Sequence, residues 1–293
     1  MLPGRFRAPQ SVRSPKPLEQ LNLTMDKTEY VAYSTVLRAD SDAVKACSGT
    51  GTCEIEIGSR ISNAFAVYVG TRLIGQFDNH AHGYGAITLK SSLPAPLLRP
   101  ADGDAPILTL LSTSLGMHSH VGTSLDFKGI VGAVKLGGVD ITSNAGGWAH
   151  GVGLLGEAAD AKNGTGSSTV RWGVCSATNH TRAPSVAQNA LTWWRADFAL
   201  ARLPSVKPFE TVLLDLYGMS RGHFSVNGHD LGKYWLINGP SGRPTQRYYH
   251  VPVSVLRFGT GATNTLVLGD ELGAPNASAP RIVFSSMVES TAK

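Results

Sequence analysis

The sequence predicts an all-β fold of two antiparallel sandwich domains, and three observations support that prediction. The chain has 293 residues, of which 33 are Gly and 16 are Pro, the residue types that weaken helices and mark turns. Charged residues make up only 16% of the chain, and Glu is a minority of the 21 acidic residues, which is unusual for helix surfaces. Short runs of alternating apolar residues recur at a spacing of about ten residues, as in antiparallel sandwiches.

The clearest strand candidates are runs in which apolar side chains alternate between turn signals. The pair Asn227-Gly228 predicts a type I′ hairpin turn, because both residues tolerate a positive φ. Helices are expected only as short segments, such as Ser185–Leu191. The strand candidates are Glu54–Gly58, Ala64–Val69, Leu73–Phe77, Ile107–Leu111, Val131–Leu136, Val212–Leu216, His223–Val226, Thr265–Leu268 and Arg281–Phe284.

A polar stretch rich in Gly and Ser, residues 158–168, predicts the boundary between the two domains. We expect a flexible basic leader over 1–17, a first domain over 18–162 and a second over 163–293. The leader has no acidic residue before Glu19, and its prolines disfavour a helix. Each domain is long enough to bury a core of its own.

The charge pattern excludes some partners. The net charge is +5, but Lys and Arg are scattered singly, so no nucleic-acid partner is expected. No stretch approaches the ~18 consecutive apolar residues of a membrane span. The start of the chain has no apolar core of a secretory signal, and its basic, acid-poor composition favours an intracellular or organellar site, mitochondria included. Four N-x-S/T sequons, at Asn22, Asn163, Asn179 and Asn276, point the other way.

The three cysteines, Cys47, Cys53 and Cys175, form neither a zinc signature nor a disulfide framework. Cys47 and Cys53 are close enough to bridge a small loop in an oxidising compartment, and three unpaired thiols are the alternative. The His-x-His pairs at 80–82 and 118–120 have no nearby Cys or Glu that would complete a tetrahedral set. We therefore expect no metal and no cofactor.

Two segments match enzyme motifs without the elements that such motifs need. Residues 151–156 match the G-x-G-x-x-G dinucleotide pattern, but a polar linker follows instead of a helix. Residues 218–222 match a nucleophile elbow around Ser220, but a strand follows, which favours a tight turn. Asp270 and Glu271 are adjacent on a strand and point to opposite faces, so they cannot flank one scissile bond. No catalytic residue is predicted.

The second half of the chain is rich in aromatic residues, which stack on the apolar faces of sugars. The alternative is that these side chains pack between the two sheets of a sandwich. The aromatic residues are Trp193, Trp194, Tyr217, Tyr234, Trp235, Tyr248 and Tyr249. From this region we take a candidate carbohydrate site of Tyr234, Trp235, Asn238, Arg247 and Tyr249.

An ordered series of segments carries a family resemblance over nearly the whole chain from Leu18. The early segments are Leu18–Asp26, Glu29–Tyr33, Leu110–Gly116, Gly129–Leu136 and Trp148–Glu157. The stronger ones are Leu191–Trp194, Gly218–Gly222, Val226–Gly228, Leu231–Trp235, Pro244–Pro252 and Asn264–Leu268. The series resembles the non-catalytic β-domains of plant-type β-galactosidases of glycoside hydrolase family 35.

The resemblance implies two jelly-roll, galactose-binding-like sandwiches without a (β/α)8 barrel. In that family both catalytic glutamates lie on an N-terminal barrel that precedes the region matched here, so no catalytic residue is transferred. The chain departs from the family at Ala32 and Leu272, where Trp is usual, and at Gly70, where Asn is usual. These departures indicate relaxed constraint on an ancestral packing or docking surface.

Three functions follow as expectations. The first is a non-catalytic binding or scaffold subunit of a larger assembly, with protein partners. The second is the non-catalytic portion, or a subunit, of an active β-galactosidase whose barrel is on another chain. The third is a carbohydrate-binding module with a galactoside ligand.

Overall fold

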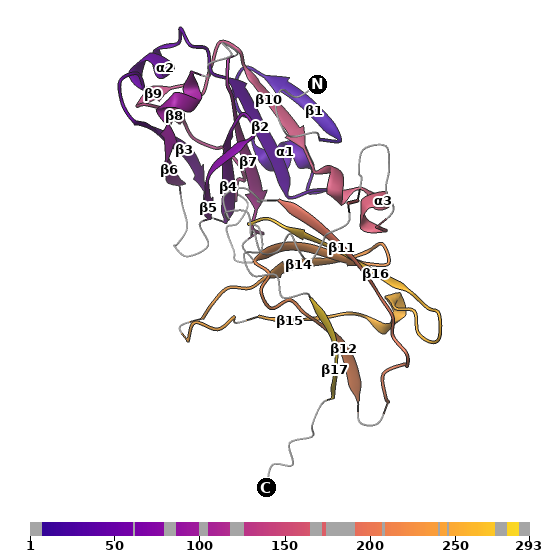
Figure 1. Ribbon diagram of the computed structural model, residues 1–293. Coiled ribbons are helices and arrows are strands. Elements are labelled where there is room, and N and C mark those ends of the chain that lie inside the picture. The colour runs from indigo at the N-terminus through magenta and orange to yellow at the C-terminus, as the bar shows by residue number, and fades with distance from the viewer. Residues whose placement is uncertain are drawn as a thin grey trace. The chain divides into compact units, whose positions relative to one another are not determined.

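The computed structural model describes residues 8–60, 62–78, 86–99, 105–117, 126–164, 172–173, 191–206, 209–239, 241–244, 246–272 and 280–286. Strands dominate the described residues, and they form four antiparallel sheets in two sandwich bodies (Figure 1). The bodies correspond to two compact units, residues 1–154 and 155–293. The predicted all-β class and two-sandwich architecture are therefore confirmed. Among the described residues, no helix has the length and apolar character needed to cross a membrane.

The first unit pairs a six-stranded sheet with a four-stranded one. The larger sheet has the order β1 (Gln10–Ser14), β10 (Trp148–Val152), β2 (Tyr30–Val36), β7 (Ile107–Ser114), β4 (Asn63–Val69) and β5 (Arg72–Asp78). The smaller has the order β6 (Ala86–Pro94), β3 (Thr52–Arg60), β8 (Val134–Leu136) and β9 (Val139–Asp140). Its helical segments are short: α1 (Gln20–Thr24), α2 (Asp42–Ala46) and η1 (Ala95–Leu98).

Period-two alternation builds the core of this unit. Ile55 and Ile57 of β3 point into the same cluster as Phe65 and Val67 of β4. All four side chains are nearly inaccessible to solvent. Trp148 closes the cluster, and its indole N–H donates to the Thr142 carbonyl at 3.0 Å, so the buried ring leaves no polar atom unpaired.

Part of the predicted flexible leader is ordered. β1 lies within residues 1–17 and pairs with β10 from Gln10 opposite Val152 to Ser14 opposite Trp148. The side chains of β1 are mostly exposed, which is why the sequence shows no apolar alternation there. Backbone pairing to a central strand holds this segment without a buried face.

The second unit pairs a four-stranded sheet with a three-stranded one. The larger has the order β11 (Thr192–Phe198), β16 (Asn264–Asp270), β13 (Arg221–Val226) and β14 (His229–Trp235). The smaller has the order β15 (Tyr248–His250), β12 (Glu210–Asp215) and β17 (Arg281–Ser286). The short helical segments are η3 (Leu155–Glu157), α3 (Ala159–Lys162) and η6 (Val253–Val255). Val212, Leu214 and Leu216 line the core from one sheet, and Phe224 and Leu268 from the other.

The strand and turn predictions agree well with these elements. Each of the nine predicted strands overlaps an observed one. The Asn227-Gly228 hairpin joins β13 to β14, with φ of 51° and 82° at its two residues. The Asn227 side chain also donates to the Asn264 side-chain oxygen at 2.8 Å and so ties the turn to β16. The predicted helix at Ser185–Leu191 lies outside the described residues except for Leu191.

The second compact unit begins at Leu155, and α3 within it is held by strands of that unit. Lys162 at the end of α3 forms a 2.5 Å ion pair with Asp230. Its carbonyl accepts a hydrogen bond from the Ser225 hydroxyl at 3.0 Å. These two contacts attach the polar 158–162 stretch to the second sandwich.

Candidate functional site

Tyr234, the first of the predicted sugar-binding residues, lies in the core of the second unit. Its side chain is 0% exposed on β14. The hydroxyl donates to Asp270, whose Oδ2 is 2.9 Å away, and lies 3.1 Å from the Gly269 carbonyl oxygen. Burial, followed by the Asp270 charge, raises the pKa of Tyr234 well above its usual value. A sugar ring has no access to this side chain.

Tyr249 and Trp235 are joined by hydrogen bonds rather than arranged as a platform. The Tyr249 hydroxyl accepts from the Trp235 N–H at 2.7 Å and donates to the Trp235 carbonyl at 3.2 Å. Tyr249 is 7% exposed and packs edge-to-face on Phe224 and Tyr234. For Tyr234 and Tyr249, packing between the sheets is therefore the role that the structure gives.

The half-buried Trp235 ring is covered by a cation. The Arg221 guanidinium carbon lies 5.0 Å from the centre of the ring. Arg221 is in turn fixed by a buried 2.7 Å ion pair with Glu271. Asn238 is exposed in the segment after β14 and forms an isolated bridge with Pro244. The five predicted residues thus do not form one surface.

Arg247 is the predicted residue that does lie in a surface cluster. Its guanidinium forms a bidentate pair with Asp215, with Nε to Oδ1 at 2.6 Å and Nη2 to Oδ2 at 2.5 Å. The guanidinium carbon lies 4.7 Å from the centre of the Tyr217 ring and 5.0 Å from that of Tyr248. Both distances are within the ~6 Å range of cation–π attraction. We call Asp215, Tyr217, Arg247 and Tyr248 the tyrosine–arginine cluster.

The pairing of β12 with β15 positions this cluster. Asp215 is opposite Tyr248 in the antiparallel register, so their side chains leave the same face of the sheet. Tyr248 and His250 are exposed, whereas Tyr249 between them is buried, which makes this the outer face. The Leu216 N–H donates to the Arg247 carbonyl at 3.1 Å and keeps the two strand ends together.

Asp215 organises the other three residues. Its Oδ1 also accepts the Tyr217 N–H at 3.0 Å, which fixes the turn that carries this ring. The Asp215 side chain is 6% exposed, whereas Tyr217 is 51% and Tyr248 48% exposed. The hydrogen bond from Arg247 lowers the pKa of Asp215, so the carboxylate stays ionised at neutral pH. The buried Asp215 carboxylate therefore holds the Arg247 guanidinium close to the two accessible tyrosine rings.

Sequence reasoning did not select Tyr217, Tyr248 or Asp215. The signal that separates Tyr248 from Tyr249 is strand alternation, since neighbouring residues point to opposite faces. Asp215 ends an apolar strand and gives no sign in sequence that Arg247 will reach it, because the pair is separated by 32 residues.

The enzyme-like motifs have structural roles. Residues 151–156 run from the end of β10 into η3, and no strand–helix unit for a dinucleotide forms there. Ser220 precedes β13 and donates to Asp270 at 2.5 Å, while Gly222 permits a close approach to the Gly269 carbonyl. The predicted His pairs at 80–82 and 118–120 lie outside the described residues. Within the described ranges no group of three or more His, Cys, Asp or Glu side chains could hold a metal ion.

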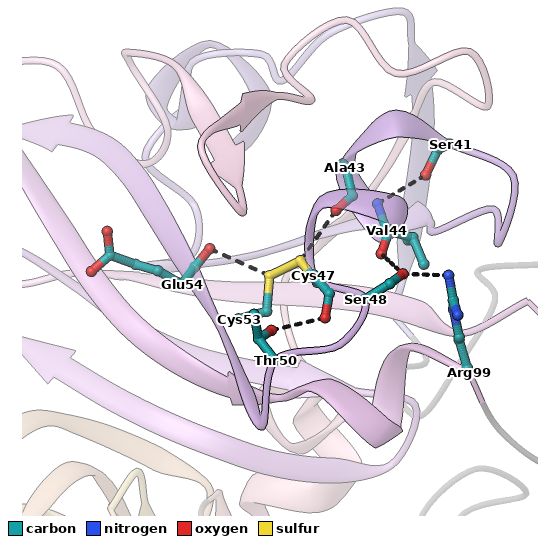
Figure 2. Close-up of a disulfide and its surroundings, with 9 residues drawn as sticks. All are labelled: Ser41, Ala43, Val44, Cys47, Ser48, Thr50, Cys53, Glu54 and Arg99. Carbon is teal, nitrogen blue, oxygen red and sulfur yellow. Dashed lines mark hydrogen bonds between the residues drawn. A yellow bond between two sulfur atoms is a disulfide. The ribbon is translucent and has the colours of Figure 1, made fainter.

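A disulfide joins Cys47 and Cys53 in the first unit, with 5.2 Å between their Cα atoms (Figure 2). It links the end of α2 to the start of β3, and both cysteines are buried. In the loop that it closes, the Thr50 hydroxyl donates to the Cys47 carbonyl at 2.9 Å. Of the two alternatives that the sequence left open for these cysteines, the structure has the bridge; Cys175 lies outside the described residues.

Comparison with known proteins points to one family. Residues 191–260 match the family described as "Beta-galactosidase, galactose-binding domain", a range that contains the whole tyrosine–arginine cluster. Beta-galactosidase 11 of Oryza sativa subsp. japonica is 29% identical over 90% of this chain and 28% of its own length. Beta-galactosidase 14 of Arabidopsis thaliana is 30% identical over 87% of this chain and 26% of its own length. Probable beta-galactosidase 2 of Dictyostelium discoideum is 26% identical over 91% and 36%.

Among solved structures, a lectin from Pleurotus ostreatus in complex with GalNAc aligns over 98% of this chain with 11% identity and a TM-score of 0.21, which does not indicate a common fold. The sequence matches are more informative, and the chain spans only about a quarter to a third of the length of the curated relatives that it matches. The chain is thus similar to the galactose-binding-domain region of plant β-galactosidases, with residues 191–260 as the matched range.

Proposed function

We propose that the chain is a non-catalytic binding region that recognises a carbohydrate, in the first instance a galactoside, through the tyrosine–arginine cluster. The observation that supports this most is the Arg247 guanidinium, whose carbon lies 4.7 Å from the ring centre of Tyr217 and 5.0 Å from that of Tyr248, both rings being about half exposed. The cluster lies inside the range that matches a galactose-binding domain.

The chemistry of the cluster suits a sugar. Exposed aromatic rings offer flat apolar surface to the C–H face of a pyranose, with little side-chain entropy to lose. Nε and Nη2 of Arg247 donate hydrogen bonds to Asp215, so the N–H groups of Nη1 can donate to ligand hydroxyls. Because the ion pair and both rings already hold the guanidinium, binding needs little reordering of the site.

We infer that any hydrolysis associated with this chain is carried out by residues outside it, on a separate region or subunit of an assembly. In support, two described glutamates form structural ion pairs with arginines. Glu210 forms a 2.5 Å pair with Arg202, and Glu271 is buried against Arg221. The scaffold role expected from the sequence stays a prediction, which light scattering of the purified protein and its co-purifying partners would test.

Calorimetric titration of the full chain with lactose and methyl β-galactoside tests the proposal. We expect measurable binding, weakened about tenfold or more by Tyr217→Ala or Tyr248→Ala, which corresponds to about 1.4 kcal/mol. Phe209→Ala is the matched control, because Phe209 is an aromatic residue 66% exposed beside the opposite end of β12. Absence of binding by the folded protein, or equal weakening by the control, would contradict the proposal. A chromogenic galactoside should give no turnover with this chain alone, and turnover would contradict the non-catalytic part.

A further inference from the structure

We propose that the tyrosine–arginine cluster prefers a sugar that carries an anionic group, a carboxylate or a sulfate ester, over a neutral galactoside. This inference rests on the proposed carbohydrate-binding function and specifies the class of ligand. It follows from the charges that the three-stranded sheet β15–β12–β17 gathers on its outer face.

A second arginine lies beside the cluster. Asp215 is opposite Tyr248 on one side and opposite Arg281 of β17 on the other. Residues directly opposite in antiparallel strands project from the same face. Tyr248, Asp215 and Arg281 therefore form one row across the three strands, with Arg247 held above Asp215.

The row carries an excess of positive charge. Arg247 and Arg281 contribute two guanidinium groups, and Asp215 one carboxylate. Both arginines lower the pKa of Asp215, Arg247 mainly by its hydrogen bonds and Arg281 by its charge alone. Asp215 thus pairs with Arg247, and among the described residues the exposed Arg281 forms no ion pair with another carboxylate.

The adjacent row provides a floor of two apolar side chains beside the exposed His250. Leu213 is opposite His250 on β15 and Val283 on β17, and both Leu213 and Val283 are partly exposed. A pyranose ring on this floor would place a carboxylate or sulfate substituent toward the arginine row. Arg donates paired N–H groups to such planar or tetrahedral anions. These charge-assisted hydrogen bonds are stronger than those that Arg forms with a neutral hydroxyl.

The site favours a sugar over an acidic peptide for a reason of shape. The exposed groups are the two tyrosine rings beside the arginine row, and flat aromatic rings suit the C–H face of a pyranose. An acidic peptide would engage the arginines and leave the tyrosine rings largely unused. The test below includes such a peptide because the two ligands share their charge.

The experiment compares matched ligands with the full chain at low salt. The neutral probes are galactose and lactose, and the acidic probes are digalacturonate and galactose 6-sulfate. We expect galactose 6-sulfate to bind about tenfold tighter than galactose, and digalacturonate about tenfold tighter than lactose. This difference in affinity should shrink as the NaCl concentration is raised, because salt screens exposed charges. Separate arms for carboxylate and sulfate show which anion is preferred.

Variants identify the residues responsible. Arg281→Gln should lower the affinity for the acidic probes far more than that for the neutral probes, while Arg281→Lys should keep part of the acidic preference. Tyr248→Ala should weaken both classes of probe. Arg257→Gln is the charge-matched control, since Arg257 is exposed and its side chain donates to the Thr263 carbonyl, away from the three-stranded sheet.

The outcomes separate this inference from the proposed function. Equal affinity for acidic and neutral sugars, or an unaltered preference in Arg281→Gln, would overturn the inference while the proposed function stands. A Glu-rich peptide of matched charge that bound tighter than digalacturonate would also overturn it. Absence of binding to every saccharide would overturn both.

Discussion

The hydroxyl of Tyr234 on β14 lies 2.9 Å from Oδ2 of Asp270 on β16, and this contact marks the centre of a buried polar group in the second unit. Asp270 also accepts the Ser220 N–H at 2.9 Å and the Ser220 hydroxyl at 2.5 Å. Burial raises the pKa of Asp270, and the hydrogen bonds oppose that shift. Tyr234 and Ser220 resemble binding or catalytic residues in the sequence, but both belong to this buried polar group and so stabilise the fold.

Tyr234→Phe is expected to destabilise the protein by about 1–3 kcal/mol, because it leaves a buried carboxylate with one donor fewer. Chemical denaturation followed by tryptophan fluorescence measures the change. Sugar affinity per folded molecule should be unaltered. A variant of normal stability with weakened sugar binding would show instead that Tyr234 contacts the ligand.

Gly222→Ala should be destabilising by about 1–3 kcal/mol, as for other overpacked positions. A Cβ at Gly222 would lie 1.8 Å from the Gly269 carbonyl oxygen, which is backbone and cannot move aside alone. Gly51→Ala is the control, since a Cβ there meets nothing within 4 Å. Thermal unfolding of both variants is the measurement, and equal melting temperatures would refute this account of the Gly218–Gly222 motif.

His150 should make the first unit sensitive to acid. Its Nδ1 is 3.1 Å from the Val12 carbonyl and its Nε2 accepts the Leu18 N–H at 3.1 Å, so both nitrogens hold the N-terminal segment. Burial lowers the pKa of His150 below its usual 6.5. Between the folded and unfolded pKa values the unfolded chain binds more protons, so this contribution to stability is complete above pH 6.5 and is lost as the pH falls.

Melting temperatures measured from pH 7.5 down to pH 5 test the role of His150. The wild-type protein should lose stability over this range. His150→Asn should be less stable at pH 7.5 and should lose less on acidification. An unaltered pH dependence in the variant would mean that other groups cause it.

Removing the Cys47–Cys53 bridge should cost about 2 kcal/mol, the loop-entropy value for a short closed loop. Cys47→Ala combined with Cys53→Ala should melt at the temperature of the wild-type protein in reducing agent, and reducing agent should not affect the variant. Alkylation of free thiols in the native protein would decide: labelling of Cys47 or Cys53 without prior reduction would contradict the bridge.

The sequence predicts the sandwich class and its central strands because buried alternation leaves a period-two pattern. β3 alternates in this way, and the predicted bounds of β3, β4 and β16 lie within two residues of the observed ones. β1 has mostly exposed side chains and is held by backbone pairing and by the His150 side chain, so it leaves no such pattern. The attachment of residues 158–162 to the second unit leaves no local sequence pattern either, because the Lys162–Asp230 ion pair joins residues 68 positions apart.

The candidate site was predicted only in part, because aromatic content does not show which rings are buried. Arg247 lies partly exposed at the surface, while Tyr234 and Tyr249 are core residues. Tyr217 and Tyr248 become a platform only when the register places Asp215 opposite Tyr248 and brings Arg247 between the rings. That arrangement is tertiary and has no local sequence signature.

The central claim is that the tyrosine–arginine cluster binds sugar, and mapping of amide chemical shifts during a saccharide titration tests it most directly. We predict that saturating shifts gather on residues 215–217, 247–250 and 281–283, and that Tyr217→Ala abolishes them without altering the rest of the spectrum. Saturating shifts confined to other surfaces, or no shifts with either neutral or acidic sugars, would contradict the claim.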